Sequence, residues 1–209
     1  RSKIFDKIII STDDEKIATV ATVYGCKLPF VRPDALAGDS ISHFQVIKHA
    51  LSSFPEYEYA AIISPTAPLI QGFHWEEAWE KLLTEQASSI TSVMEIPWKY
   101  HPDKSFVKFK GEGYRVGNAR LTGTPRQELN SAYYGTGGIY IFKTSNLEEG
   151  SLYGNDPTIY ELDSDEWALD VNEIEDIDEI RCRIAIPCPP LVKQMDEEAY
   201  IKLCKEYEK

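Results

Sequence analysis

The feature that most constrains the fold is an alternation of short apolar or β-branched runs with amphipathic helix patterns. The runs typical of strands are Lys7–Thr12, Cys26–Val31, Tyr59–Ile63 and Ser89–Ile96. Helical spacing of apolar residues fills the intervals between them and ends at Tyr24, Phe54 and Thr84. The resulting β-α-β-α-β-α-β order predicts a doubly wound α/β domain in which Tyr59–Ile63 is a central strand.

The chain changes character after this alternating half. Apolar blocks become short between Pro97 and Ser131, where a hairpin is predicted from Ser105–Phe109 and Tyr114–Val116, so we expect an inserted arm over about residues 97–131. Core elements then resume as strands and helices at Gly137–Phe142, Thr158–Leu162, Ala168–Val171, Glu173–Cys182 and Asp196–Tyr207. No repeat interrupts the pattern, and a single domain over residues 1–209 is expected.

Composition limits the classes of partner. The 209 residues carry a formal net charge of −12 with no basic run, which argues against nucleic acid as a partner. A small anionic substrate remains compatible, because a divalent cation and a few arginines can reverse the local field. No segment reaches the roughly 20 apolar residues that span a bilayer, so no membrane partner is expected.

The cysteines indicate the compartment. Cys26, Cys182, Cys188 and Cys204 form no C-x-x-C pair and have no histidine at zinc-finger spacing. We expect free, reduced thiols and a cytoplasmic protein.

Polar residues follow several predicted strands, where ligands of doubly wound sheets bind. After the first strand comes Ser-Thr-Asp-Asp, in which Asp13 or Asp14 can cap the helix that Gly25 ends; the turn is either only a cap or the rim of a ligand site. Asp39 or Ser40 is the expected cap of the next helix. Arg32 lies after the second strand.

The segment Ser64-Pro65-Thr66-Ala67-Pro68 follows the strand Tyr59–Ile63. Two prolines make it stiff, so it is either a rigid turn or a fixed wall that presents backbone and the Thr66 hydroxyl to a ligand.

A metal site is predicted at Asp170 and Asn172, which flank Val171 and therefore share one side of a strand end. Mg²⁺ takes oxygen ligands of this kind, often together with phosphate oxygens. The alternative is that Asn172 caps the helix beginning at Glu173. Asp176 and Asp178 are interpreted as a solvated helix face.

One arginine, Arg126, stands where the arm returns to the core. Arg126 is either a surface residue or a guanidinium fork for a carboxylate or phosphate. The histidines do not cluster by spacing and are assigned no chemistry: His43, His49, His74 and His101.

Taken together, these motifs resemble the acylneuraminate cytidylyltransferases, which activate sialic and related nonulosonic acids as CMP-sugars. The segments that carry the resemblance occur in the family's order: STDDEKIATVATVYG, PFVRPDALAGDSIS, SPTAPL, PRQELNSAYYGTGGIYIF and ALDVNEIEDI. Each motif alone is weak, but their common order over most of the chain is specific.

The resemblance implies a Rossmann-like three-layer nucleotidyltransferase fold with a mixed, mostly parallel sheet and an inserted dimerisation arm. It further implies CTP and a sugar acid as substrates, Mg²⁺ as cofactor and a homodimer. Asp170 becomes the catalytic residue and, with Asn172, the metal ligand. The residues implied on the substrate side are Asp13, Arg32, Ser64, Thr66, Arg126, Tyr134 and Gly137.

The sequence departs from the family at some of these positions. Asn172 replaces the second Asp of the metal motif, Tyr134 an Arg, Thr136 an Asn, and Ser64 the Gln of sialic-acid enzymes. These positions are at the metal and the acceptor, so they bear on which sugar is used.

The family's opening strand and its glycine- and lysine-rich phosphate loop are not found in these 209 residues. We therefore expect a native chain longer by roughly 30–50 residues, the length of one βα unit with its loop, and we expect the present chain alone to lack full activity.

Two alternatives stay open. One is a nucleotidyltransferase for another sugar, either a 3-deoxy keto acid or a sugar-1-phosphate. The other is a non-catalytic nucleotide-sugar-binding domain, which the absent loop and Asn172 favour.

Overall fold

The structure is a computed structural model that describes residues 2–38, 40–109, 112–115 and 130–183. The chain divides into two compact units, Arg1–Asp170 and Val171–Lys209, and each is described by itself. The single domain expected over residues 1–209 stays a prediction. The predicted final helix, Asp196–Tyr207, lies outside the described residues.

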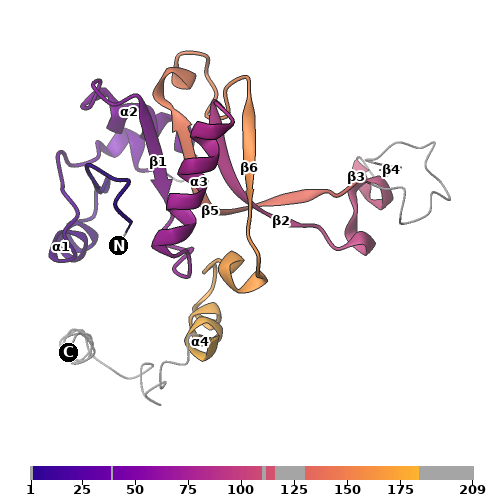
Figure 1. Cartoon of the computed structure of the whole chain (residues 1–209). Coiled ribbons are helices and arrows are strands. Elements are labelled where there is room, and N and C mark those ends of the chain that lie inside the picture. The colour runs from indigo at the N-terminus through magenta and orange to yellow at the C-terminus, as the bar shows by residue number, and fades with distance from the viewer. Residues whose placement is uncertain (1, 39, 110–111, 116–129, 184–209) are drawn as a thin grey trace. The chain divides into compact units, whose positions relative to one another are not determined.

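The first unit contains all the described strands and three of the helices (Figure 1). The helices are α1 (Glu15–Val23), α2 (His43–Ser52) and α3 (Gly72–Thr84). The strands are β1 (Tyr59–Ile63), β2 (Ser89–Glu95), β3 (Phe106–Phe109), β4 (Glu112–Arg115), β5 (Tyr133–Lys143) and β6 (Pro157–Glu161). Short 3₁₀ turns include η6 (Thr144–Leu147) and η7 (Asp165–Ala168). The second unit contains α4 (Ile174–Arg183), which confirms the helix predicted at Glu173–Cys182.

Four strands form the main sheet in the order β1-β5-β2-β6. β5 is antiparallel to both β1 and β2, whereas β2 and β6 are parallel. The expected α/β fold with a mixed sheet is therefore confirmed. The expectation of a mostly parallel sheet is wrong for the described pairings, because β5 enters the sheet directly from the arm and separates two strands that share one direction.

The strands predicted at Lys7–Thr12 and Cys26–Val31 are reduced to one parallel bridge between Ile9 and Lys27. Ile10 N–H donates to Lys27 O, and Lys27 N–H donates to Ile8 O. The next donor of a parallel ladder would be residue 29, which is proline and has no N–H. The strand prediction is wrong in extent because Pro29 stops the pairing after a single step.

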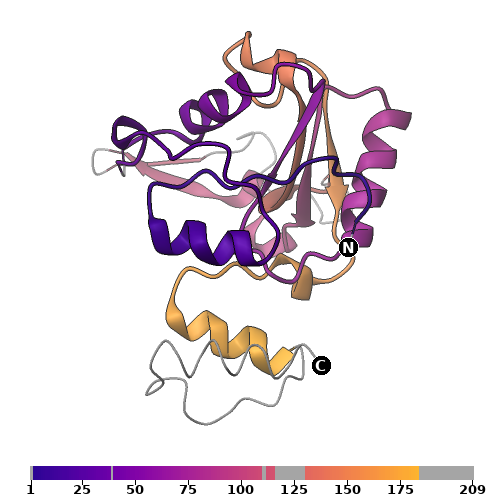
Figure 2. The ribbon, with the colours of Figure 1, turned by 90° about the vertical axis from the view of Figure 1, so that its left-hand side faces the viewer.

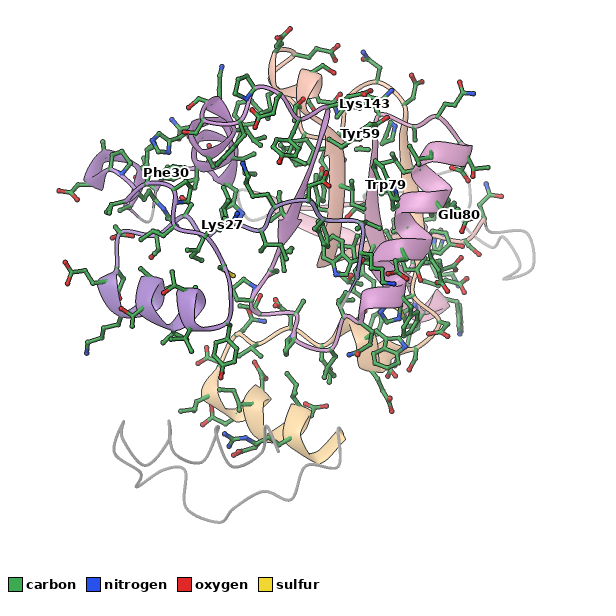
Figure 3. All side chains as sticks on the ribbon, turned by 60° about the vertical axis from the view of Figure 1, so that its left-hand side comes forward. Lys27, Phe30, Tyr59, Trp79, Glu80 and Lys143 are labelled. Carbon is green, nitrogen blue, oxygen red and sulfur yellow. The ribbon has the colours of Figure 1, made fainter. Side chains whose placement is uncertain are left out.

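Helix α3 packs on one face of the sheet (Figures 1 and 2). Trp75, Ala78 and Leu82 are buried at helical spacing and contact buried isoleucines of β2 and β5. Tyr59 and Trp79 lie beside each other at this face, with ring centroids 4.9 Å apart (Figure 3). This is the first helix layer of the expected architecture; the full three-layer arrangement stays a prediction.

Local helix signals were predicted with mixed success. Asp14 caps α1 and Gly25, at φ +91°, follows its end, as predicted. The cap of α2 is Ser42, which forms a capping box with Gln45, so the expectation of Asp39 or Ser40 is wrong. The predicted strand Ala168–Val171 is also wrong, because the Ser164 side chain accepts from Glu166 N–H and starts the 3₁₀ turn η7.

The pairing of β2 with β5 contains a bulge. Thr91 pairs with Tyr140 and Val93 with Gly135, so two steps along β2 face five along β5. Ser92, 0% exposed, fills the bulge: its Oγ accepts from Ile139 N–H at 2.8 Å. Bulges of this kind redirect nearby backbone and often stand next to functional sites.

β1 is the edge strand of the sheet, so the prediction of a central strand is wrong for the described pairings. Thr144 N–H donates to Glu58 O, and with the antiparallel register this turns the backbone groups of Tyr59, Ala61 and Ile63 away from β5. Within the described ranges, no backbone hydrogen bond to another strand is found at this outer edge. Such an edge can accept a further strand; the preceding strand expected from the resemblance stays a prediction.

The predicted hairpin of the arm is confirmed as β3 and β4, which pair as a separate two-stranded sheet. Its role in dimerisation stays a prediction. Most of the rest of the arm, residues 116–129, lies outside the described residues.

The close packing of Gly138 against Ile70 predicts that a larger residue at position 138 lowers stability. A Cβ added at Gly138 would lie 2.8 Å from Ile70 Cγ1 and 2.9 Å from Cδ1, whereas one at Gly135 would meet nothing within 4 Å. Because Ile70 itself packs against the core, Gly138→Ala should destabilise the protein by roughly 1–3 kcal/mol, the usual cost of overpacking. Urea unfolding measures the difference, with Gly135→Ala as the matched control. Equal unfolding midpoints for the two variants would contradict the close packing.

Candidate functional site

One end of the sheet, called the polar edge below, is where β1 and β2 finish and β5 starts. Ile63, the last residue of β1, pairs with Ile139, and Glu95 at the end of β2 pairs with Tyr133. This register brings four predicted residues to the polar edge: Ser64, Thr66, Tyr134 and Gly137. Ligand sites of open α/β sheets lie at such strand ends.

The loop Ser64–Gln71 connects β1 to α3 and is anchored by apolar residues. Ala67 and Leu69 are buried, and Ile70 packs against the Gly138 backbone. This anchoring leaves Ser64 and Thr66 half-buried, with their hydroxyl oxygens 2.8 Å apart in a hydrogen bond. The loop is thus anchored as a rigid turn, as predicted; its alternative role as a wall that presents the Thr66 hydroxyl to a ligand stays a prediction.

Gly137 lies within the β2–β5 bulge, and Tyr134 lies just before it, opposite Met94 near the end of β2. Gly137 has φ +72°, a conformation that favours glycine, and Tyr134 is 45% exposed. Two supporting residues have hydroxyl oxygens 2.7 Å apart: Ser92, which the sequence reasoning missed, and Thr136, which it named only as a departure from the family. The only sequence signal for Ser92 was a serine inside an otherwise core-forming strand.

The turn Ser11–Asp14 divides its polar groups between structure and surface. Thr12 Oγ1 accepts from Asp14 N–H at 3.1 Å, and Asp14 Oδ1 accepts from Lys16 and Ile17 N–H at 2.7 and 2.9 Å. Asp14 is therefore the helix cap. Asp13 is exposed and borders a shallow hollow of about 310 Å³ that also includes Leu28 and Val31.

Arg32 is half-buried and tied to this turn. Its N–H donates to Thr12 O, and its guanidinium donates to Ser11 O. In the described part of the chain, no hydrogen bond joins Arg32 or Asp13 to Ser64 or Thr66. The structure thus brings the predicted residues together as two groups, one at each of these two segments.

Asp170 follows η7, which lies against β5 and β2, and its side chain is exposed. It closes the first unit, and Asn172 belongs to the second. In the second unit Asp176 Oδ2 accepts from Asn172 and Glu173 N–H at 2.7 and 2.8 Å, bonds that lower the pKa of Asp176. Asp176, interpreted from the sequence as part of a solvated helix face, therefore also caps the start of α4, and Asp178 is exposed, as predicted.

His74 in α3, assigned no chemistry from the sequence, is 2% exposed and lies among polar and aromatic groups. Its Nδ1 accepts from Gln71 N–H at 3.0 Å, and its ring is 5.0 Å from that of Trp167 in η7. Burial lowers its pKa, partly opposed by the carboxylates of Asp163 and Glu77. The imidazole is therefore neutral near pH 7, with its proton on Nε2.

His101 has a different structural role at the base of the arm. It is 7% exposed, and its Nε2 lies 2.9 Å from Asn130 O, so it links the two ends of the arm. A hollow of about 330 Å³ borders this contact, between Glu95 and Ala132.

Some predictions fall outside the described residues or find no cluster there. Arg126 lies outside them, so its position stays a prediction. Within the described ranges, no three His, Cys, Asp or Glu side chains gather as a metal cluster, and no helix is both long and apolar enough to cross a membrane. Cys26 is a free thiol, as expected.

The structure is that of an α/β protein with a mixed sheet, and polar residues follow the ends of its strands. Residues 1–181 match the cytidylyltransferase family, and the chain belongs to this family. Membership of this family makes the protein a nucleotidyltransferase, as the sequence analysis predicted.

Two relatives with known names indicate which cytidylyltransferases the chain is similar to. The chain is 28% identical over 183 residues to a pseudaminic acid cytidylyltransferase of Campylobacter jejuni, a match that covers 85% of this chain and 77% of the relative. It is also 28% identical to an N-acylneuraminate cytidylyltransferase of Streptococcus agalactiae, covering 84% of this chain and 42% of the relative.

Among solved structures, the chain is similar to CMP:2-keto-3-deoxy-manno-octonic acid synthetase complexed with CTP. The TM-score is 0.63 at 13% identity, and the match covers 88% of this chain and 83% of that one. At this identity the likeness shows the fold.

The two aspartates of the turn are expected to differ in their effect on stability. Asp14→Ala removes the acceptor of two N–H groups at the start of α1, so it should lower the urea midpoint of unfolding. Asp13→Ala is the matched control and should leave the midpoint unchanged. The assignment of the cap fails if the Asp13 variant is the less stable of the two.

The effect of Asp14 should depend on pH in a defined direction. Backbone N–H groups of Ile17 and Lys16 lower the pKa of Asp14. A carboxyl with a depressed pKa contributes stability above its unfolded value of about 3.9 and loses it as the pH falls through the folded value. The midpoint difference between wild type and Asp14→Ala should therefore be full at neutral pH and shrink below about pH 3.9.

Proposed function

We propose that the protein activates a nonulosonic acid of the pseudaminic or sialic type as its CMP-sugar, using CTP and releasing pyrophosphate. The observation that carries the proposal is the match to a pseudaminic acid cytidylyltransferase, which spans 85% of the chain. The polar residues at the sheet edge are consistent with it, because a nucleotide needs both a rigid wall and exposed polar groups at strand ends.

In this reaction the anomeric hydroxyl oxygen of the sugar acid bonds to the α-phosphorus of CTP, and the bond to the pyrophosphate oxygen breaks. The hydroxyl proton passes to solvent. Thr66 and Ser64 would present their hydroxyls to the nucleotide from the rigid loop. Asp13 would line the nucleotide from the turn Ser11–Asp14, and Arg32 from the segment hydrogen-bonded to that turn. The chain's contribution is mainly positioning, which can supply a large share of a rate enhancement.

Mg²⁺ fits the donor set only in a particular way. Asp170 supplies one exposed carboxylate, and the described residues contain no cluster of three metal-binding side chains. A magnesium ion held by one carboxylate, with phosphate oxygens and water as its other ligands, is a normal arrangement. Asp170, assisted by Asn172, would hold the ion together with CTP. When bound, the ion offsets charge on the phosphate oxygens.

The acceptor and the assembly complete the proposal. Arg126 would bind the carboxylate of the sugar acid, and Tyr134 and Gly137 would border the acceptor. The hairpin β3–β4 is a two-stranded sheet by itself, and such hairpins are only marginally stable without a covering surface. This supports a homodimer in which the arm meets a second copy.

The function is tested by incubating the full-length protein with CTP, Mg²⁺ and a panel of acceptors while pyrophosphate is measured. The panel should include pseudaminic acid, N-acetylneuraminic acid, a 3-deoxy keto acid and a sugar-1-phosphate. Release only with a nonulosonic acid supports the proposal, and release only with one of the other two supports a related transferase. Tight CMP-sugar binding with no turnover would instead support a binding domain.

Asp170→Ala is expected to remove nearly all turnover while the protein still folds, because an exposed carboxylate at this position is not needed by the core. Pyrophosphate release and the urea midpoint should be measured together. Asp156→Ala is the control. This aspartate directly precedes the first residue of β6, away from Asp170, which follows the last one, so the variant should keep full activity. Wild-type turnover by the Asp170 variant in Mg²⁺ would refute the metal role.

Arg126→Ala is expected chiefly to raise the KM for the sugar acid, because a guanidinium–carboxylate pair binds the acceptor rather than the nucleotide. The measurement is steady-state kinetics with each substrate varied in turn. A rise in the KM for CTP, with the acceptor KM unchanged, would show that this arginine belongs to the nucleotide side.

A further inference from the structure

His74 lies between the two segments to which the proposed function assigns its residues. It is almost fully buried at the start of α3, with 2% of its surface exposed. One side of the imidazole faces the loop Ser64–Gln71, and the ring also contacts the segment that leads to Asp170. Nothing in the reaction requires this histidine to contact a substrate.

The link to the loop consists of hydrogen bonds. His74 Nδ1 accepts from Gln71 N–H at 3.0 Å, and Gln71 Nε2 donates to Leu69 O at 2.8 Å. Ala67 N–H then donates to Ser64 O at 3.3 Å. His74 thereby fixes the end of the loop whose beginning carries the Ser64 and Thr66 hydroxyls.

The link to the Asp170 segment consists of ring contacts. The His74 and Trp167 rings are 5.0 Å apart at 66°, a favourable edge arrangement. Trp167 Nε1 donates to Asp163 Oδ1 at 2.9 Å, which fixes the indole from its other end. Because Trp167 is three residues before Asp170, the position of its ring limits where that carboxylate can lie.

We propose that His74 is a positioning residue that couples the nucleotide loop to the Asp170 segment, with its Nδ1 holding the loop and its ring holding Trp167. This rests on the proposed function. The two links use different properties of the side chain, so they can be separated by substitution. Asn keeps an acceptor near the position of Nδ1 but loses the ring, whereas Phe keeps the ring but loses the acceptor.

The test uses His74→Phe and His74→Asn in the full-length protein. His74→Phe should raise both the Kd for CTP, measured by calorimetry, and the KM for CTP by about tenfold, because a buried N–H loses its partner, while kcat stays within about twofold. His74→Asn should keep the Kd for CTP within about twofold and lower kcat by about tenfold, since small displacements of catalytic groups are costly. Gln71→Ala removes the side-chain bond to Leu69 O but keeps the backbone N–H bond to His74, so it should weaken CTP binding in the same direction as His74→Phe and by less, and it tests the loop link if the Phe variant does not fold.

The control is His49→Asn in α2, where the lost ring contact is with Phe30 at 4.8 Å and neither segment is involved. It should change neither the CTP affinity nor kcat, whatever it does to the unfolding midpoint. The coupling is overturned if both His74 variants lower only the midpoint, or if both change the same kinetic parameter. If the wild type binds CTP but converts no acceptor, the proposed function fails, and the contrast in CTP affinity between the Phe and Asn variants still decides whether His74 holds the loop.

Discussion

The register of β5 is the constraint on which the rest of the first unit depends. β5 is antiparallel to β1 and to β2: its first residue, Tyr133, pairs with Glu95 at the end of β2, and Ile139 farther along pairs with Ile63 at the end of β1. The extra residues opposite Ser92 bring Gly138 against Ile70, and this contact seats the loop that carries Ser64 and Thr66. A slip by one residue would turn every side chain of β5 to the other face of the sheet. The bulge at buried Ser92 therefore fixes both the packing of the core and the position of the loop that carries Ser64 and Thr66.

The acidic balance of the chain sets a second constraint. With a net charge of −12, the protein repels an anionic nucleotide and an anionic sugar acid at long range. The hydroxyls of Ser64 and Thr66 are neutral, and the Arg32 guanidinium already donates to Ser11 O. Binding must therefore draw on local cations, which is why Arg126 and a magnesium ion at Asp170 are the assignments on which the proposed activity depends most.

The sequence predicted local structure better than partners. Asp14 as a cap, α3 and the helix after Asp170 follow from short patterns that nearby residues satisfy. The pairing of strands does not, because a β-branched run says nothing of its neighbours: Pro29 stops the first ladder, and β5 lies between β1 and β2. Ser92 and His74 were missed for a related reason, since their roles depend on contacts with residues distant in sequence or on a bulge that only the sheet creates.

The contacts that hold the site's loops are uncharged. A neutral imidazole accepts from Gln71, a serine hydroxyl fills the bulge, and Ile70 packs on Gly138. Salt screens interactions between exposed charges but has little effect on such buried contacts. The geometry of the loops should thus be independent of ionic strength, while the attraction of anionic substrates to exposed cations depends on it. An acidic protein that must bind anions gains from this separation, because these three loop contacts use none of the cations that its substrates need.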